Sequence, residues 1–304
     1  MTEILARALG LVLIIALGYG LKRWGYLSAD YFPAFSQLVL TVTLPCALVT
    51  SFNEAQIVPS MLGLAAFAFV LNLAQQLLGY LLARRRDPVE RGFAILHGGS
   101  YNIGAFALPY LSAFMGPSGM VSAALFDVGN ALGSAGVGRG WARSVADRTH
   151  RTTPLRFLRQ MVSSPVFDVY LVLVALRLLQ VQLPGPVITV TSLIGAANPF
   201  LAMLMIGIGL EVRLPRSKLR LALVVLAQRY LWAVVLALTT WFVLPWPRET
   251  RVIVVMLLLA PWAAMVSGFT SEINADVEVS TFITTVSVLV AVVMLPSLLL
   301  LLQG

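Results

Sequence analysis

The chain is divided into apolar runs that are each long enough to cross a lipid bilayer. A transmembrane helix needs roughly 20 predominantly apolar residues to span the hydrocarbon core. These runs are hydrophobic on every side rather than on one helical face, as expected of helices surrounded by lipid. Turn residues and charges separate ten of them, near 4–21, 33–52, 58–83, 92–114, 118–138, 163–180, 187–210, 219–244, 251–270 and 279–302. The sequence therefore predicts an all-α polytopic membrane protein with ten transmembrane helices.

The composition excludes an ordinary water-soluble domain. Of the 304 residues, 59% are hydrophobic and 11% are charged, whereas soluble domains have roughly 45–50% and 25%. The basic residues that give the net charge of +8 lie in short loops. They do not alternate with aromatic residues on one face, as they do in a nucleic-acid-binding protein. Cys46 is the single cysteine, so it forms no internal disulfide and belongs to no metal-site spacing. We therefore expect no nucleic-acid partner, no bound metal and no cofactor.

The basic residues are distributed unevenly between the two sides of the predicted membrane segments. The loops on one side are rich in basic residues and hold Lys22, Arg23, Arg84, Arg85, Arg86, Arg91, Arg139, Arg143, Arg148, Arg151, Arg156, Arg159, Arg213, Arg216, Lys218 and Arg220. By the positive-inside rule, this side is cytoplasmic. The prediction is a multi-pass protein of the cell inner (plasma) membrane, with both termini extracytoplasmic. The first run lacks a basic leading segment and a cleavage site, so we expect it to be retained.

A basic stretch at 139–162 is the only substantial polar linker. It divides the chain into a first repeat at 1–138 and a second repeat at 163–304, with five runs in each. Because an odd number of helices precedes the second repeat, that repeat enters the membrane from the opposite side. This is the 5+5 inverted repeat found in many secondary transporters.

The fourth and ninth runs each contain an interior proline, Pro109 and Pro261. Proline removes one helical hydrogen bond and clashes with the preceding turn. In lipid such a break is tolerated where protein or a water-filled cavity satisfies the freed backbone groups. Paired breaks at matching positions of two repeats indicate a transporter's binding site. The alternative is a plain proline kink, which is common in membrane helices.

Five polar side chains inside the apolar runs have competing interpretations. Asn102 either bonds a neighbouring helix or contacts the substrate. Arg229 lies deep in the eighth run, where it pairs with Asp127, neutralises a substrate or snorkels to the surface. His97 is either a proton carrier or a hydrogen-bonded structural residue. Asp168 is the other acid inside the predicted segments. Proton or charge coupling through His97, Asp127, Asp168 and Arg229 is thus one interpretation.

Several stretches resemble the auxin efflux carrier family, which includes plant PIN carriers and bacterial permeases for malonate and malate. The most specific is the segment from Tyr101 to Pro109, with an Asn followed by Pro seven positions later, and Leu125 to Asn130 continues the pattern. In the second half the similar stretches are Ala196 to Phe200 and Ala260-Pro261. The family lies within the bile-acid/sodium symporter-like superfamily.

The resemblance implies a fold and a site. Helices 1, 2, 6 and 7 would form a scaffold, helices 3–5 and 8–10 a transport domain, and helices 4 and 9 would cross at their broken middles. A homodimer through the scaffold is also implied. The substrate would lie at the crossing, and Trp262 beside Pro261 would narrow the pocket. The residues expected there are Asn102, Pro109, Pro261 and Trp262, with Pro45, Cys46, Ser51, Asn198 and Pro199 on the facing scaffold wall.

The predicted function is secondary transport of small organic anions, such as carboxylates or auxin-like acids, by an elevator mechanism. The coupling ion would be H⁺ or Na⁺. One alternative is a sodium-coupled carrier of bile-acid-type anions, and another is a membrane sensor that binds its ligand without moving it. No Walker sequence, nucleophile elbow or zinc pattern is present, so we do not expect an enzyme.

Overall fold

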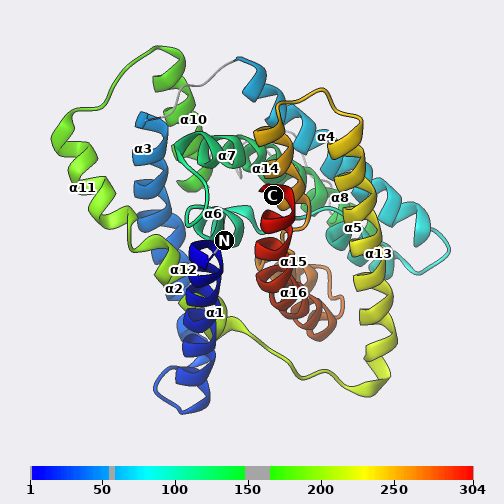
Figure 1. Cartoon of the computed structure of the whole chain (residues 1–304). Coiled ribbons are helices and arrows are strands. Elements are labelled where there is room, and N and C mark those ends of the chain that lie inside the picture. The colour runs from blue at the N-terminus through cyan, green and yellow to red at the C-terminus, as the bar shows by residue number, and fades with distance from the viewer. Residues whose placement is uncertain (1, 55–58, 148–164, 304) are drawn as a thin grey trace.

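The computed structural model describes residues 2–54, 59–147 and 165–303, and every regular element among them is helical (Figure 1). Short 3-10 or π-helical turns lie at Ala29–Tyr31, Val39–Thr43, Ile103–Ala107 and Leu132–Gly138. The helices are α1 (Thr2–Arg23), α2 (Phe32–Leu38), α3 (Leu44–Glu54), α4 (Pro59–Leu82), α5 (Pro88–Gly98), α6 (Leu108–Leu111), α7 (Pro117–Ala131), α8 (Arg139–Ala146), α10 (Pro165–Leu178), α11 (Gly185–Gly195), α12 (Asn198–Gly209), α13 (Arg216–Phe242), α14 (Arg248–Leu258), α15 (Met265–Glu272) and α16 (Val277–Gln303).

The prediction of an all-helical membrane protein is confirmed in its coarse form. Six helical stretches of the described chain are long and apolar enough to span a membrane: Ala29–Glu54, Gly63–Leu82, Pro117–Ala146, Gly185–Gly209, Arg216–Phe242 and Val277–Leu302. The predicted runs near 92–114 and 251–270 are each interrupted in the middle. The count of ten and the inverted repeat therefore stay predictions.

The boundary of the predicted linker differs in the structure. Helical structure continues from α7 through a π-helical turn into α8 and ends at Ala146, beyond the expected boundary at 138. The polar composition of 139–146 conceals this, because Arg139 and Arg143 extend from an amphipathic helix end whose Ala142 is buried. The remainder of the predicted linker, from 148, lies outside the described residues.

The helices pack in two sets. In Figure 1, α3, α11 and α12 of the first set lie on the left and α4, α5 and α13 of the second set lie on the right, with α7 between them. In the first set α1 packs on α12, α11 on α3, and α10 on α3. In the second set α4 packs on α7 and α5, while α13 packs on α14 and α16. Contacts of α3 and α10 with α7, and of α1 with α16, join the sets. These packing partners are those implied for scaffold and transport domains, but the division into moving domains stays a prediction.

A glycine crossing brings α1 and α12 together. A Cβ added to Gly18 would clash with the carbonyl oxygen of Leu204, and one added to Gly207 would clash with that of Ile15. Small residues allow this close backbone approach, which takes the place of a hydrophobic driving force between membrane helices.

We expect Gly18→Ala to destabilise the protein by about 1–3 kcal/mol, because the added methyl group must push α12 away. Thermal unfolding of the detergent-purified protein measures this as a lowered melting temperature. Gly10→Ala is the matched control on the same helix, since a Cβ there meets no atom within 4 Å. Equal melting temperatures for the two variants would show that the crossing does not hold α1 in place.

Candidate functional site

The first helix interruption lies between α5 and the π-helical turn at Ile103–Ala107, over residues 99–102. Gly98 and Gly99 lie against the backbone of α4. A Cβ on Gly98 would lie 2.6 Å from the Gln75 carbonyl oxygen, and one on Gly99 would lie 2.7 Å from that of Asn72. Gly99 is extended, with φ −135° and ψ 108°. Close approach of two backbones thus coincides with the end of the helix.

The expectation that Pro109 itself breaks the helix is wrong. Pro109 lies inside the continuous helical stretch from Ile103 to Leu111, directly after the π-helical turn, so the chain stays helical through the proline. The chain leaves helical geometry several residues earlier, at the glycines, and re-enters through the π-helical turn. In the second half the prediction holds, since residues 259–264 between α14 and α15 include Pro261.

The two interruptions bond directly to each other. The Asn102 backbone N–H donates to the Pro261 carbonyl oxygen at 2.8 Å. The Trp262 indole Nε1 donates to the His97 carbonyl oxygen at 3.0 Å. Trp262 is fully buried, and its indole hydrogen bond connects the second interruption to the end of α5 beside the first. The sequence therefore located both breaks approximately, and the structure brings them into contact.

Neighbouring helices satisfy the backbone groups that the interruptions free. Asn130 of α7 clamps the Tyr101 peptide from both sides: its Oδ1 accepts from Tyr101 N at 3.1 Å, and its Nδ2 donates to Tyr101 O at 2.9 Å. Ser287 of α16 accepts from Trp262 N at 3.2 Å. Gln76 of α4 donates to Gly99 O at 3.3 Å. Side chains of three helices thus replace the missing helical bonds, as the absence of water in a bilayer requires.

Asn130 and Ser287 bond the backbone of the interruptions, a role that the sequence did not assign to them. The available signal was a polar side chain within an apolar run. Such a side chain must make a hydrogen bond, because burying it without one costs free energy. Many such residues are present in these runs, and only the packed structure distinguishes a peptide clamp from an ordinary interhelical bond.

We expect Asn130→Ala to destabilise the protein by about 2 kcal/mol or more, because it leaves two peptide groups buried without partners. Thermal unfolding in detergent is the measurement. Ser134→Ala is the control one turn along, since Ser134 bonds only the Asn130 carbonyl oxygen of its own helix. A melting temperature of Asn130→Ala equal to that of Ser134→Ala would contradict the clamp.

Arg229 of α13 lies beside both interruptions. It is 5% exposed, and its Nη2 donates to the Ala260 carbonyl oxygen at 3.0 Å. Its guanidinium lies 4.1 Å from the Tyr101 ring centroid and 5.2 Å from that of Trp262. The buried Nη1 has no hydrogen-bond partner. Within the part of the chain that the structure describes, the cation is therefore held by aromatic faces and one carbonyl group, with no acid bonded to it.

Of the three interpretations of Arg229, the pairing with Asp127 is not the one that the structure has. Asp127 Oδ1 accepts from Asn130 Nδ2, and Asp127 Oδ2 accepts from the Tyr170 hydroxyl, each at 2.9 Å. These bonds link α10 to the clamp residue, on a different side of the break. A Cβ on Gly104 would lie 3.2 Å from Asp127 Oδ2, so the carboxylate borders the chain just after Asn102.

His97 is buried at the end of α5, with both ring nitrogens engaged. Nδ1 lies 2.9 Å from the Phe93 carbonyl oxygen, and Nε2 lies 2.9 Å from Ser280 Oγ. A carbonyl oxygen only accepts, so Nδ1 carries the proton. In the neutral ring Nε2 then accepts from the serine hydroxyl. The geometry thus fits a hydrogen-bonded structural residue as well as a proton carrier.

The side chains of the remaining predicted residues make few contacts with the interruptions. Asn102 is 6% exposed, and its carboxamide makes no hydrogen bond among the described residues. Asn198 begins α12 and accepts from Thr43 at 2.9 Å. The first residue of α3, Leu44, borders the break: a Cβ on Gly104 would lie 3.5 Å from its side chain. The half-buried residues outside this contact are Pro45, Cys46, Ser51, Pro199 and Asp168.

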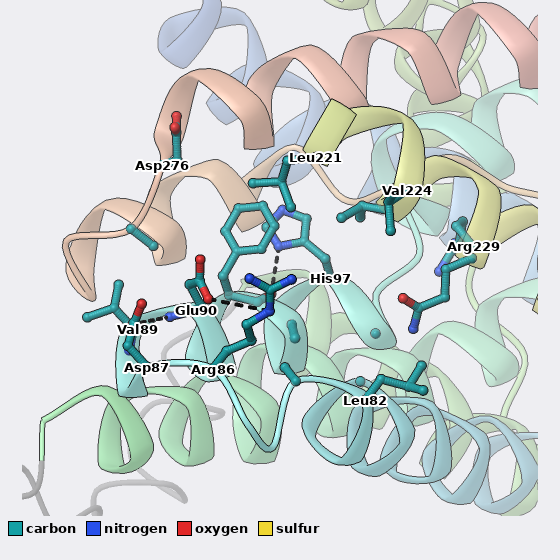
Figure 2. A pocket seen from close by; sticks show the side chains of 18 of the residues that line it. Leu82, Arg86, Asp87, Val89, Glu90, His97, Leu221, Val224, Arg229 and Asp276 are labelled. Atoms are coloured by element: carbon teal, nitrogen blue, oxygen red, sulfur yellow. Dashed lines mark hydrogen bonds and ion pairs between the residues drawn. The ribbon is translucent and has the colours of Figure 1, made fainter. Parts of the chain in front are cut away.

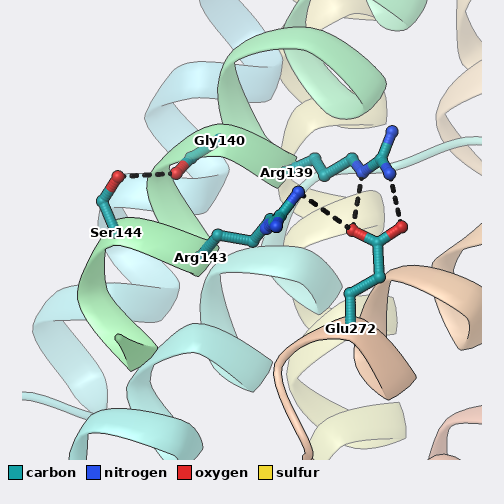
Figure 3. Close-up of polar contacts among 5 residues, drawn as sticks. All are labelled: Arg139, Gly140, Arg143, Ser144 and Glu272. Carbon is teal, nitrogen blue, oxygen red and sulfur yellow. Dashed lines mark hydrogen bonds and ion pairs between the residues drawn. The ribbon is translucent and has the colours of Figure 1, made fainter. Parts of the chain in front are cut away.

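Ion pairs lie at the ends of α8, α13, α15 and α16. Glu272 accepts from Arg139 Nε at 2.8 Å and lies 3.8 Å from Arg143 Nη1 (Figure 3). Lys218 Nζ lies 2.8 Å from Asp276. Partial burial would raise the pKa of Asp276, but hydrogen bonds from Lys218 and the Val279 amide outweigh it and lower the pKa. These acids are thus paired rather than simply solvated.

Among the described residues, no group of three or more His, Cys, Asp and Glu side chains is placed to hold a metal ion. The polar groups at the site are instead carbonyl oxygens, amides, one guanidinium and one carboxylate. This set can bind an organic ligand by hydrogen bonds.

Spanning helices and two mutually bonded interruptions define a multi-pass membrane transport protein. Residues 4–137 match the family model described as “Membrane transport protein”. An “Uncharacterized transporter” of Methanothermobacter thermautotrophicus (strain Delta H) is 23% identical over 294 residues, which cover 95% of each chain. The match confirms the resemblance to the auxin efflux carrier-like family. The protein is a transporter and not an enzyme.

Proposed function

We propose that the protein is a secondary transporter of small organic anions and that the substrate binds where the two interruptions meet. The observation that carries the proposal is the bond from Asn102 N to Pro261 O between two broken helices. Interrupted helices at mid-membrane present backbone groups and helix ends to a ligand, which continuous helices cannot do.

The charge beside the interruptions supports an anionic substrate. Arg229 is a buried cation with no bonded acid, within contact of Tyr101 and Trp262. A charge at this depth is costly and most often belongs to a substrate pathway. The Asn102 carboxamide has no partner among the described residues, so it is available to donate to a carboxylate. A small carboxylate is therefore the substrate class that we favour.

The proposed movement is elevator-like. The set containing α4–α8 and α13–α16 would move as a transport domain against a scaffold of α1–α3 and α10–α12, with ten helices arranged as a 5+5 inverted repeat. The packing partners support this division, because contacts within each set are more extensive than those between them. The protein would reside in the inner membrane with both termini extracytoplasmic, and scaffold helices would form a homodimer.

We expect Asn102→Ala to abolish uptake of the carboxylate substrate by proteoliposomes while leaving the melting temperature unchanged. The side chain makes no internal hydrogen bond, so its loss removes a substrate contact rather than a structural one. Thr189→Ala is the control for loss of a polar group, because Thr189 is exposed and bonds only Gly185 O of its own helix. Normal uptake by Asn102→Ala would remove this residue from the site.

The same assay separates the alternatives. Uptake of bile acids that requires sodium, with none of small carboxylates, would favour the sodium-coupled carrier. Saturable binding with no flux into liposomes would favour a ligand sensor.

We propose that protons drive the transport and that Asp127 carries them. Its carboxylate borders Gly104, two positions after Asn102. An ionised carboxylate there would repel an anionic substrate, and protonation would remove the repulsion. Substrate and proton would then bind together, which is the requirement for symport. Tyr170 and Asn130 hold the carboxylate in position.

We expect Asp127→Asn to lose the pH-gradient-driven accumulation of substrate but to keep exchange between internal and external substrate. The amide mimics the protonated acid permanently, so binding no longer depends on pH. Tyr170→Phe is the comparison, since it keeps the carboxylate and should retain driven uptake. Accumulation by Asp127→Asn that responds to the pH gradient as the unmodified protein does would exclude Asp127 as the proton carrier.

A further inference from the structure

A crevice of about 800 Å³ lies between α13 and the α4–α5 pair (Figure 2). It runs from a charged rim, where Arg86 and Glu90 lie, to an inner end at His97 and Arg229. This volume is within the range of small-molecule binding sites, roughly 300–1,000 Å³. The predicted substrate residue Asn102 and the α3 and α12 walls are not part of its lining. Apart from Arg229, which borders both, the crevice is thus lined by residues other than those of the proposed transport site.

The inner end of the crevice carries unused hydrogen-bond donors. Gln75 accepts from the Tyr101 hydroxyl through Oε1 at 2.8 Å, and its Nε2 donates to no group in the described chain. Gln228, one residue before Arg229, makes no hydrogen bond there either. Arg229 uses only Nη2, for Ala260 O, and its buried Nη1 has no partner. Two amides and a guanidinium with no bonded acid therefore converge on one end.

The walls between the inner end and the rim are apolar and reach the lipid-facing surface. Leu82 is 61% exposed and Val224 57% exposed, and both belong to candidate membrane spans. Trp232, Leu221 and Phe93 extend the apolar lining. Exposed apolar side chains in a membrane span contact acyl chains, so the crevice is open to an amphiphile that arrives from the bilayer.

The acids at the rim are already engaged. Asp87 accepts from the Val89 and Glu90 amides at 2.9 Å each. Glu90 lies 3.9 Å from Arg86, and Asp276 is paired with Lys218. The negative charge at the mouth is therefore compensated, whereas the positive charge at the inner end is not.

We propose that this crevice binds a monocarboxylic acid with an apolar tail, with the carboxylate at Gln75, Gln228 and Arg229 and the tail between α4 and α13. Arg229 contacts Ala260, Tyr101 and Trp262 with its other side. A bound acid would therefore contact Arg229, which itself contacts both helix interruptions. The site is a second anion site behind the interruptions, in addition to the proposed transport site.

Decanoate with a bromine on C2, beside the carboxylate, tests the site, because bromine quenches a tryptophan that it contacts and Trp232 of the crevice lining follows Gln228 by one helical turn. In lipid nanodiscs we expect saturable quenching that Trp232→Phe removes. Gln228→Leu should weaken binding roughly tenfold or more, as loss of a hydrogen bond to a charged group does. Val224→Trp should abolish saturable binding by filling the crevice, and its added indole is accounted for by titrating the same variant with bromodecanol. These variants avoid Arg229, whose removal would also release Ala260.

Leu231→Trp is the matched control on α13, since Leu231 is 63% exposed and outside the crevice lining. It should bind bromodecanoate with unchanged affinity. Asn102→Ala should also bind normally, whether or not it transports. Equal binding by Val224→Trp and Leu231→Trp, or equal saturable binding of bromodecanol and bromodecanoate, would overturn the proposal. Loss of binding in Asn102→Ala would overturn it too, by moving the ligand to the transport site.

Discussion

Inside a bilayer a peptide group that leaves its helix finds no water to bond, and leaving it unpaired costs several kcal/mol. Both interruptions in this protein expose such groups, and the surrounding helices supply the partners. Asn130 holds the Tyr101 peptide, Ser287 the Trp262 amide, and Arg229 the Ala260 carbonyl oxygen. The two breaks also bond each other through Asn102 and Pro261. The positions of α7, α13 and α16 relative to the breaks are therefore determined by hydrogen bonding as well as by apolar packing.

The scarcity of water also determines how the charges are arranged. Asp127 is compensated by Tyr170 and Asn130, whereas Arg229 is compensated by aromatic faces and a carbonyl oxygen only. Asp127 bonds only neutral donors, so it remains able to take up a proton. Arg229 has no acid bonded to it among the described residues, so it remains able to attract an anionic ligand. A direct ion pair between them would have neutralised both. This separation is the physical basis for the proposed roles in coupling and in anion binding.

The sequence predicted the membrane class, the helical fold and the approximate places of both interruptions. Its error at Pro109 has a local cause, since the chain stays helical through the proline by means of the π-helical turn before it. The true break follows from Gly98 and Gly99 lying against α4. The sequence left the pairing of Arg229 with Asp127 open, because it does not show which faces of α7 and α13 meet. Asn130 was overlooked because nothing local distinguishes a peptide clamp from the many other polar residues in apolar runs.

The length of an apolar run and the turn residues that bound it are properties of contiguous residues. The sequence by itself therefore determined that this chain crosses a membrane repeatedly and approximately where its helices are interrupted. The partner of a buried polar group lies far away along the chain: 29 residues separate Tyr101 from Asn130, and 165 separate His97 from Trp262. Only the tertiary structure decided those pairings, because they depend on which helix faces meet. The same packing left Arg229, Gln75 and Gln228 together at the inner end of one crevice, which no spacing in the sequence indicates.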